Sequence, residues 1–322
     1  MKSFSIEKPV GFSLQAASDF YAGFTPGSGM AAAAVDRLTL AFRLDHSFEA
    51  VAVSLREERG ALIAELAGTR DEVAVHKQLS RMLGLEADAE AWLALGQRVP
   101  LVGQLQREFP GFFTAAKASP YDAAVWAIIS PRLQIAQAAR IKLELAEQYG
   151  TKVELHGRLH HVFPAPECLL GLERADGLSD EKVLRLRGVA RAALEGLLDA
   201  DHLRSLGEHA ALAWLQTLRG IGPWSASHVY FRGAAPLDGL PTAEPRVLHG
   251  LAAASGSSVP SAASFQRAAE SWRPFRMWVC VLLSRHLART DGWRAQHLPR
   301  ERAAAGKALA QKTRKRSREL VG

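Results

Sequence analysis

Cysteine is scarce in this sequence, which has two in 322 residues. Cys168 and Cys280 lie far apart in the chain and in apolar surroundings. Two thiols cannot form a metal framework of their own, and the spacing of iron–sulfur ligands is absent. A disulfide scaffold and an iron–sulfur protein are therefore excluded, and we expect two buried thiols.

Long apolar runs are also missing. No stretch of eighteen apolar residues occurs, so no membrane span or membrane partner is expected. The start, "MKSFSIEKPVGF", lacks the apolar segment and small-residue cleavage site of a signal peptide. With 48% apolar and 23% charged residues the composition is that of a globular protein. We expect a cytoplasmic, nucleoid-associated monomer.

Net charge is lacking over most of the chain. Residues 294–322 hold nine Lys or Arg and two Glu, an excess that equals the whole formal charge of +7. The rest is formally neutral. Such a tail is typical of an electrostatic arm that binds a polyanion such as nucleic acid. The alternative is a solvated tail that only aids solubility.

The chain divides into a mixed part and a helical part. Alternating apolar residues predict strands over 38–46, 48–57 and 61–68, with a hairpin turn at 58–60. A helix with an Asp cap is predicted over 71–85. Beyond it the pattern is helical throughout. The predicted fold class is mostly α, with a small N-terminal α+β domain of antiparallel sheet (1–90), an all-α body (91–293) and the basic tail (294–322).

The stretch "TLRGIGPWSASHVYFRG" (217–233) breaks one helix and at once begins another. Gly220 and Gly222 permit positive φ and close approach to their amides. Pro223 suits the first turn of the next helix, since its missing N–H would have no partner there. Converging amides at a helix N-terminus form an anion site, with phosphate the expected anion. The alternative is a plain tight turn between helices.

Several ordered segments share a resemblance to one family. They are "LAWLQTLRGIGPWSASHVYFRG", "SPYDAAVWAIISPRLQIAQAARIKLELAEQYG" (119–150), "FPAPECLLGL" with "GLSDEKVLRLRGVARAALEGLLD" (163–199), and "SWRPFRMWVCVLLSRHL" (271–287). Together, over about residues 100–293, they resemble the helix-hairpin-helix DNA glycosylase superfamily, specifically its 3-methyladenine DNA glycosylase II (AlkA-like) branch. The resemblance places the helix-hairpin-helix at 208–232.

The resemblance implies a role for the hairpin. In the family it clamps a backbone phosphate of double-stranded DNA beside a nucleotide flipped out of the duplex, because the glycosidic bond is inaccessible within the stack. The residues that would do so here are Gly220, Ile221, Gly222, Trp224 and Ser225. A Na⁺ or K⁺ ion could bridge the hairpin to phosphate, and no other cofactor is expected.

The family's catalytic Asp corresponds by register to Glu244 in "LPTAEPRV". A carboxylate can stabilise an oxocarbenium-like transition state and orient the attacking water. Glu keeps the charge but reaches further, and it is a poor helix cap, so helix propensity does not explain it. The alternative is a surface residue in a site that has drifted.

The base pocket departs from the family pattern. Trp224 matches the aromatic after the hairpin, but His228, Pro245 and Ser284 stand where aromatics are expected. Those aromatics would stack on a cationic alkylated base. The predicted pocket comprises Trp224, His228 and Ser284, with Trp126 and Trp278 as replacement surfaces; each Trp could equally be core, and His228 a surface histidine.

Two further positions bear on the reaction. Arg132, with Leu133 beside it, stands where the family inserts a wedge into the duplex, although Arg132 could also be an ordinary exposed residue at a helix start. No lysine occurs between Lys182 and Lys307, so the Schiff-base lysine of bifunctional members is absent and no β-lyase activity is expected.

The resemblance implies a monofunctional DNA glycosylase of base excision repair that acts on an alkylated or deaminated base. The alternative is a lesion-binding or architectural DNA-binding protein that keeps the hairpin but has impaired catalysis. The change of the catalytic Asp to Glu and the lost aromatics are the features that keep this alternative open.

Overall fold

The N-terminal part is built on an antiparallel sheet. The computed structural model describes residues 2–23, 31–34 and 36–290. The sheet has the order β1-β5-β4-β3-β2, and its strands are β1 (Lys2–Glu7), β2 (Ala31–Ala34), β3 (Arg37–Arg43), β4 (Ala50–Glu58) and β5 (Ala61–Ala67). The three strands predicted from apolar alternation are β3, β4 and β5. β1 was not predicted, because this edge strand buries only Ile6 fully and its sequence therefore shows little alternation of apolar and polar residues.

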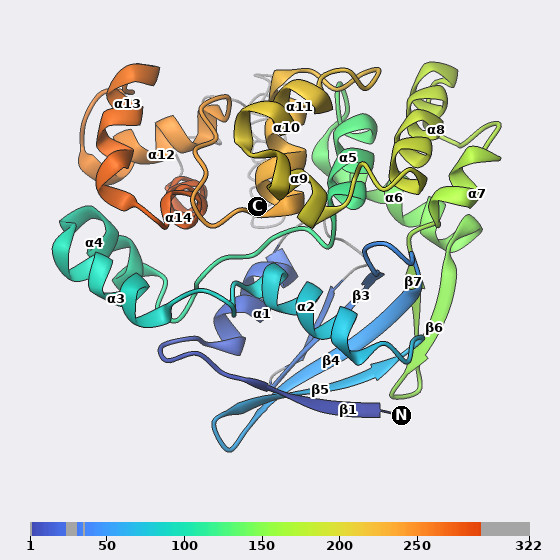
Figure 1. Cartoon of the computed structure of the whole chain (residues 1–322), viewed down its shortest axis with the longest axis horizontal. Helices are drawn as coiled ribbons and strands as arrows, with labels where there is room; N and C mark the ends of the chain where they lie inside the picture. The colour runs from blue at the N-terminus through green and yellow to red at the C-terminus, as the bar shows by residue number, and fades with distance from the viewer. Residues whose placement is uncertain (1, 24–30, 35, 291–322) are drawn as a thin grey trace, which may run out of the picture.

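Two helices lie between this sheet and the rest of the molecule (Figure 1). They are α1 (Leu14–Gly23) and α2 (Glu72–Leu83). As predicted, α2 begins after a capping Asp71, whose carboxylate accepts from the amide of Ala74, and it ends at Gly84 with φ +74°. Its buried side chains join those of the sheet and of the C-terminal helices in one apolar core. The two parts therefore share a core.

The expectation that every element after residue 90 is helical is wrong at one place. β6 (Thr151–Leu155) and β7 (Arg158–Val162) form an antiparallel hairpin, turned by His156 and Gly157 with φ +54° and +70°. Its apolar side chains pack against the N-terminal sheet, in a cluster of Ala41, Ala50, Ala52, Val153, Leu155 and Val162. The hairpin is too short for its alternation to stand out between two helices.

The other elements after α2 are helical (Figure 1). They are α3 (Ala89–Arg98), α4 (Pro100–Glu108), α5 (Pro120–Ile129), α6 (Ile135–Tyr149), α7 (Pro166–Leu170), α8 (Asp180–Leu194), α9 (Ala200–Leu206), α10 (Glu208–Leu215), α11 (Pro223–His228), the π-helix η2 (Val229–Ala234), α12 (Pro245–Ser255), α13 (Ala262–Ala269), the 3₁₀ turn η3 (Glu270–Trp272) and α14 (Arg276–Arg289). The mostly helical fold class is confirmed.

The described residues bear on the predictions of no membrane span and of two buried thiols, but not on that of the basic tail. None of their helices has the length and apolar character needed to cross a membrane. Cys280 is buried as expected, but Cys168 is exposed, because it lies on the short helix α7 with its side chain outward. The basic tail at 294–322 lies outside the described residues.

Candidate active site beside the hairpin

The break between α10 and α11 is a tight turn that depends on one glycine. Gly220 has φ +88°, in the left-handed region, and a Cβ there would meet the side chain of Arg185 at 2.5 Å. The amide of Ile221 bonds to the carbonyl of Leu218 at 2.9 Å, and Ile221 is buried beneath the turn. Gly220 is therefore required for the backbone conformation.

Gly222 serves another purpose. Its φ of −91° and ψ of −176° are open to any residue, and it is the N-cap of α11, with Pro223 in the first turn as predicted. A Cβ on Gly222 would meet no atom within 4 Å. Within the described residues the amides of Trp224 and Ser225 donate to no acceptor, as first-turn amides do without a capping side chain. The open space at Gly222 therefore lies beside the unpaired amides of Trp224 and Ser225.

Glu244 is brought to this turn by the fold. It is the N-cap of α12, where its Oε1 accepts from the amide of Arg246 at 3.1 Å. Its Oε2 accepts from the indole Nε1 of Trp224, also at 3.1 Å. The half-buried carboxylate therefore faces the residue that follows the hairpin. Glu244 acts as a helix cap after all, because a two-residue reach to Arg246 suits its longer side chain.

The ring of Trp224 is stacked on His228. Their ring centroids are 5.3 Å apart and the planes meet at 16°, while Trp224 is 39% exposed. His228 Nε2 is buried without a hydrogen-bond partner among the described residues. Burial, and after it the positive charges of Lys117 and Arg232, hold the pKa of His228 well below its usual value. The imidazole is therefore neutral at pH 7.

A group of buried charges lies near this histidine. Asp122 forms ion pairs with Lys117 at 3.4 Å and with Lys142. Desolvation lowers the pKa of Lys117 to about 7, whereas the two lysines outweigh desolvation at Asp122 and lower its pKa to about 2. Two lysines against one carboxylate leave the surroundings of His228 positive.

The wedge loop follows α5. Arg132 is exposed and has φ +63°, whereas Leu133 is half-buried and packs on the core. Lys182 of α8 holds this loop, since its Nζ donates to the carbonyls of Ile129 at 2.6 Å and Pro131 at 2.9 Å.

The same helix also supports the hairpin. Glu181 is paired with Arg219 at 2.8 Å and with Arg185, whose side chain lies against Gly220. Sequence reasoning missed these α8 residues, because a charged residue on a helix gives no sign of the loop it will meet. α8 therefore fixes the hairpin and the wedge loop relative to each other.

The other predicted pocket residues lie elsewhere in the packing. Trp126 is buried with Lys117 over its ring at 5.3 Å, and Trp278 is buried among Trp92, Phe113 and Phe275. Trp278 also lines a cavity of 370 Å³, whose lining includes neither Trp224 nor Glu244. Ser284 is half-buried and donates to the carbonyl of Cys280 at 3.0 Å. No ring contact joins either tryptophan to Trp224 or His228, so the pocket composition remains a prediction.

No protein-family model matches the chain. It is 27% identical over 168 residues to a DNA-3-methyladenine glycosylase of Bacillus subtilis, covering 51% of this chain and 54% of that protein. It is 25% identical over 196 residues to DNA-3-methyladenine glycosylase 2 of Escherichia coli, covering 60% and 65%. Thus it spans between half and two thirds of the length of these relatives.

The fold has solved counterparts. A 3-methyladenine DNA-glycosylase from Archaeoglobus fulgidus superposes with a TM-score of 0.75 at 22% identity, over 88% of this chain and 98% of that one. An 8-oxoguanine glycosylase/lyase of Clostridium acetobutylicum, bound to double-stranded DNA, gives a TM-score of 0.58 at 14% identity, over 82% and 98%.

The chain is thus similar in sequence to DNA-3-methyladenine glycosylases and shares its fold with DNA glycosylases of known structure. These sequence relatives agree with the AlkA-like resemblance. The hairpin offers backbone oxygens to the monovalent cation that the resemblance implies. The carbonyl oxygens of Arg219 and Gly220 accept no hydrogen bond from the described residues, so they could coordinate Na⁺ or K⁺.

Proposed function

We propose that the protein is a monofunctional DNA glycosylase of base excision repair, which hydrolyses the N-glycosidic bond of a damaged base flipped out of double-stranded DNA. The observation that carries the proposal is the hydrogen bond from Trp224 to Glu244, because it holds beside the hairpin the carboxylate that corresponds by sequence register to the family's catalytic Asp. The similarity to DNA-3-methyladenine glycosylases supports an alkylated base as substrate, with a deaminated base as the second class.

DNA binding begins at the hairpin. The amides of Trp224 and Ser225 donate to a phosphate oxygen at the N-terminus of α11, and Gly222 lets the backbone approach. Arg132, exposed at the end of α5, fills the space left by the flipped nucleotide while Leu133 supports it from the core. Since α8 holds both segments, the phosphate and the gap are engaged at a fixed separation.

Glu244 supplies the chemistry. As the bond from C1′ to the base nitrogen breaks, the base leaves with the electron pair and positive charge develops on the sugar. The Glu244 carboxylate stabilises that charge and positions a water for attack on C1′. Trp224 and Arg246 donate to its two oxygens, which fixes its orientation while lone pairs remain for the substrate.

The reaction is monofunctional because no amine is placed to attack the sugar. Trp224 and Ser225 follow the hairpin where bifunctional members have a lysine. Lys117 is fully buried and paired with Asp122. Water is therefore the nucleophile, and the product is an abasic site with an intact backbone.

The test is a panel of duplexes with one methylated, etheno, hypoxanthine or uracil base each. Glycosylase activity is expected to give strand breaks only after alkali, with no covalent adduct on borohydride treatment. An adduct would contradict the monofunctional assignment. Tight binding to one lesion without base release across the panel would instead establish a lesion-binding protein.

A further inference from the structure

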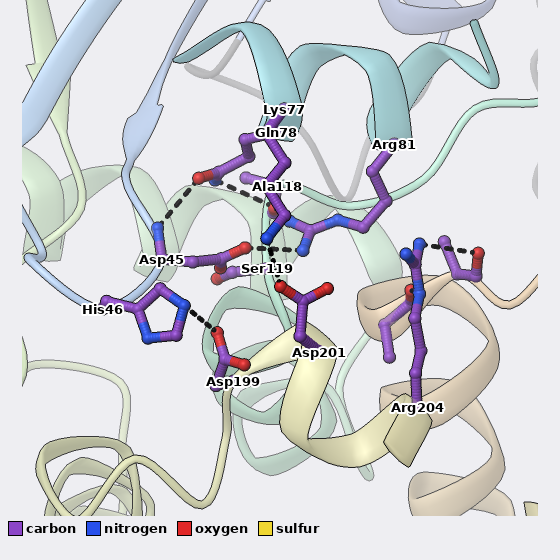
Figure 2. A network of polar contacts seen from close by, with 12 residues as sticks. Asp45, His46, Lys77, Gln78, Arg81, Ala118, Ser119, Asp199, Asp201 and Arg204 are labelled. Carbon is purple, nitrogen blue, oxygen red and sulfur yellow. Dashed lines mark hydrogen bonds and ion pairs between the residues drawn. The ribbon is translucent and has the colours of Figure 1, made fainter. Parts of the chain in front are cut away.

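A second polar cluster lies where the β3–β4 turn meets the start of α9 (Figure 2). His46 comes from the turn, and Asp199 and Asp201 come from the first residues around α9. His46 Nε2 is 3.1 Å from Asp199 Oδ2. One ligand atom from each of the three residues lies within 4.8 Å of the other two. The glycosylase reaction uses none of them.

Asp199 is the unusual member. It is 7% exposed, and its Oδ1 caps α9 by accepting from the amide of His202 at 2.8 Å. Its Oδ2 has no hydrogen-bond partner among the described residues and points toward His46. No Lys or Arg in the described part of the chain forms an ion pair with it. A carboxylate desolvated to this degree calls for a cationic partner.

The neighbouring aspartates are already held by cations, in each case through one oxygen. Lys77 pairs with Oδ2 of Asp201, and Arg81 pairs with Oδ2 of Asp45, both at 2.5 Å. The second oxygen of Asp201 is left open, and Oδ1 of Asp45 is buried with no partner among the described residues. Figure 2 shows both carboxylates near Asp199, each oriented by its donor.

We propose that His46, Asp199 and Asp201 form a binding site for a divalent cation of the zinc class. One imidazole nitrogen and two carboxylate oxygens suit Zn²⁺, whereas Mg²⁺ and Ca²⁺ prefer oxygen ligands alone. Water completes the coordination, because the side chains of His46 and Asp201 are 68% and 45% exposed.

The site has to contract to bind the ion. Zinc bonds of about 2.1 Å in a tetrahedron separate ligand atoms by roughly 3.4 Å, less than the 4.8 Å limit that contains the three atoms now. The exposed side chains of His46 and Asp201 can make this movement, while Asp199 stays fixed as the cap of α9. The ion would tie the β3–β4 turn of the N-terminal sheet to α9 of the helical body.

The experiment uses the full, tag-free chain after treatment with a chelator. We expect one Zn²⁺ per chain by mass spectrometry of the metal after gel filtration. At saturation the midpoint of thermal unfolding should rise by about 5 °C. MgCl₂ at the same concentration should leave the midpoint unchanged.

Two variants and one control assign the ligands. His46→Ala removes the nitrogen, and Asp199→Asn keeps the capping oxygen while replacing Oδ2, so α9 remains capped. Each should weaken zinc affinity at least tenfold. His209→Ala changes an exposed histidine elsewhere and should bind zinc as the parent does. Unchanged stoichiometry and affinity in the two site variants, or absence of zinc binding to the parent chain, would overturn the proposal.

Discussion

The indole Nε1 of Trp224 donates a hydrogen bond of 3.1 Å to Oε2 of Glu244, and this contact joins the end of the hairpin to the start of α12. It places the candidate phosphate clamp and the candidate catalytic carboxylate in one unit. The same tryptophan stacks on His228, so one side chain touches both the candidate reaction centre and the candidate base pocket.

Replacing Glu244 with Gln keeps the shape of the side chain and removes its charge. We expect base release under single-turnover conditions to fall about 10²- to 10³-fold, because the developing positive charge loses its carboxylate. Affinity for lesion DNA should change little. Glu195→Gln, at an exposed position, is the matched control. Excision at the parental rate in Glu244→Gln would remove Glu244 from the mechanism.

Replacing Trp224 with Phe keeps an aromatic ring on His228 and deletes the donor to Glu244. The rate of base release should fall roughly tenfold, in keeping with a hydrogen bond to a charged group. Trp224→Ala should also weaken DNA binding, since it removes the ring. Trp214→Phe serves as the control. Parental activity in Trp224→Phe beside a loss in Trp224→Ala would show that the hydrogen bond is irrelevant and only the ring matters.

The two hairpin glycines should respond differently to alanine. Gly220→Ala forces a residue with a side chain to φ +88° and should cost about 1–2 kcal/mol of unfolding free energy. Gly222→Ala meets no atom in the fold, so its stability should be parental while DNA affinity falls about tenfold. Gly256→Ala, at φ +63° in the C-cap of α12, should lose stability without losing affinity. Parental affinity in Gly222→Ala would argue against a phosphate at this turn.

Stability should depend on Lys117 above neutral pH. Its pKa is lowered from 10.5 to about 7 by desolvation, so between these values the unfolded chain binds a proton that the folded chain does not. The free energy of unfolding therefore gains a rising contribution from about pH 7 to 10.5, and below pH 7 the contribution is constant. Urea titrations should show a smaller rise for Lys117→Met than for the parent. Lys152→Met, an exposed change, should keep the parental slope, and an identical slope in Lys117→Met would refute the assignment.

Removing residues 294–322 tests the basic tail. If the tail contacts phosphates, the plot of log affinity against log salt should become shallower, because fewer counterions are released on binding. A tail of the same length with its basic residues changed to Gln separates charge from bulk. A slope that stays at the parental value in both proteins would leave the tail without an electrostatic role in DNA binding.

Local patterns predicted much of the fold and part of the site. Alternating apolar residues predicted β3, β4 and β5, and Asp71 predicted the start of α2, because both signals arise within a few residues. The sequence also predicted the turn at Gly220 and Gly222 and the position of Pro223 in the first turn of the next helix. The β6–β7 hairpin was not, because its strands are stabilised by Ala50 and Ala52, a hundred residues away in the chain.

The sequence by itself determined the backbone at the hairpin, since only glycine accepts the φ of residue 220 and proline fits the turn that follows. It also put an acidic residue at position 244. Only the tertiary structure decided that Glu244 faces Trp224, that α8 braces the wedge loop, and that His46 meets Asp199. Each of these contacts joins segments distant in sequence, and packing of the shared core, rather than local propensity, sets their separation.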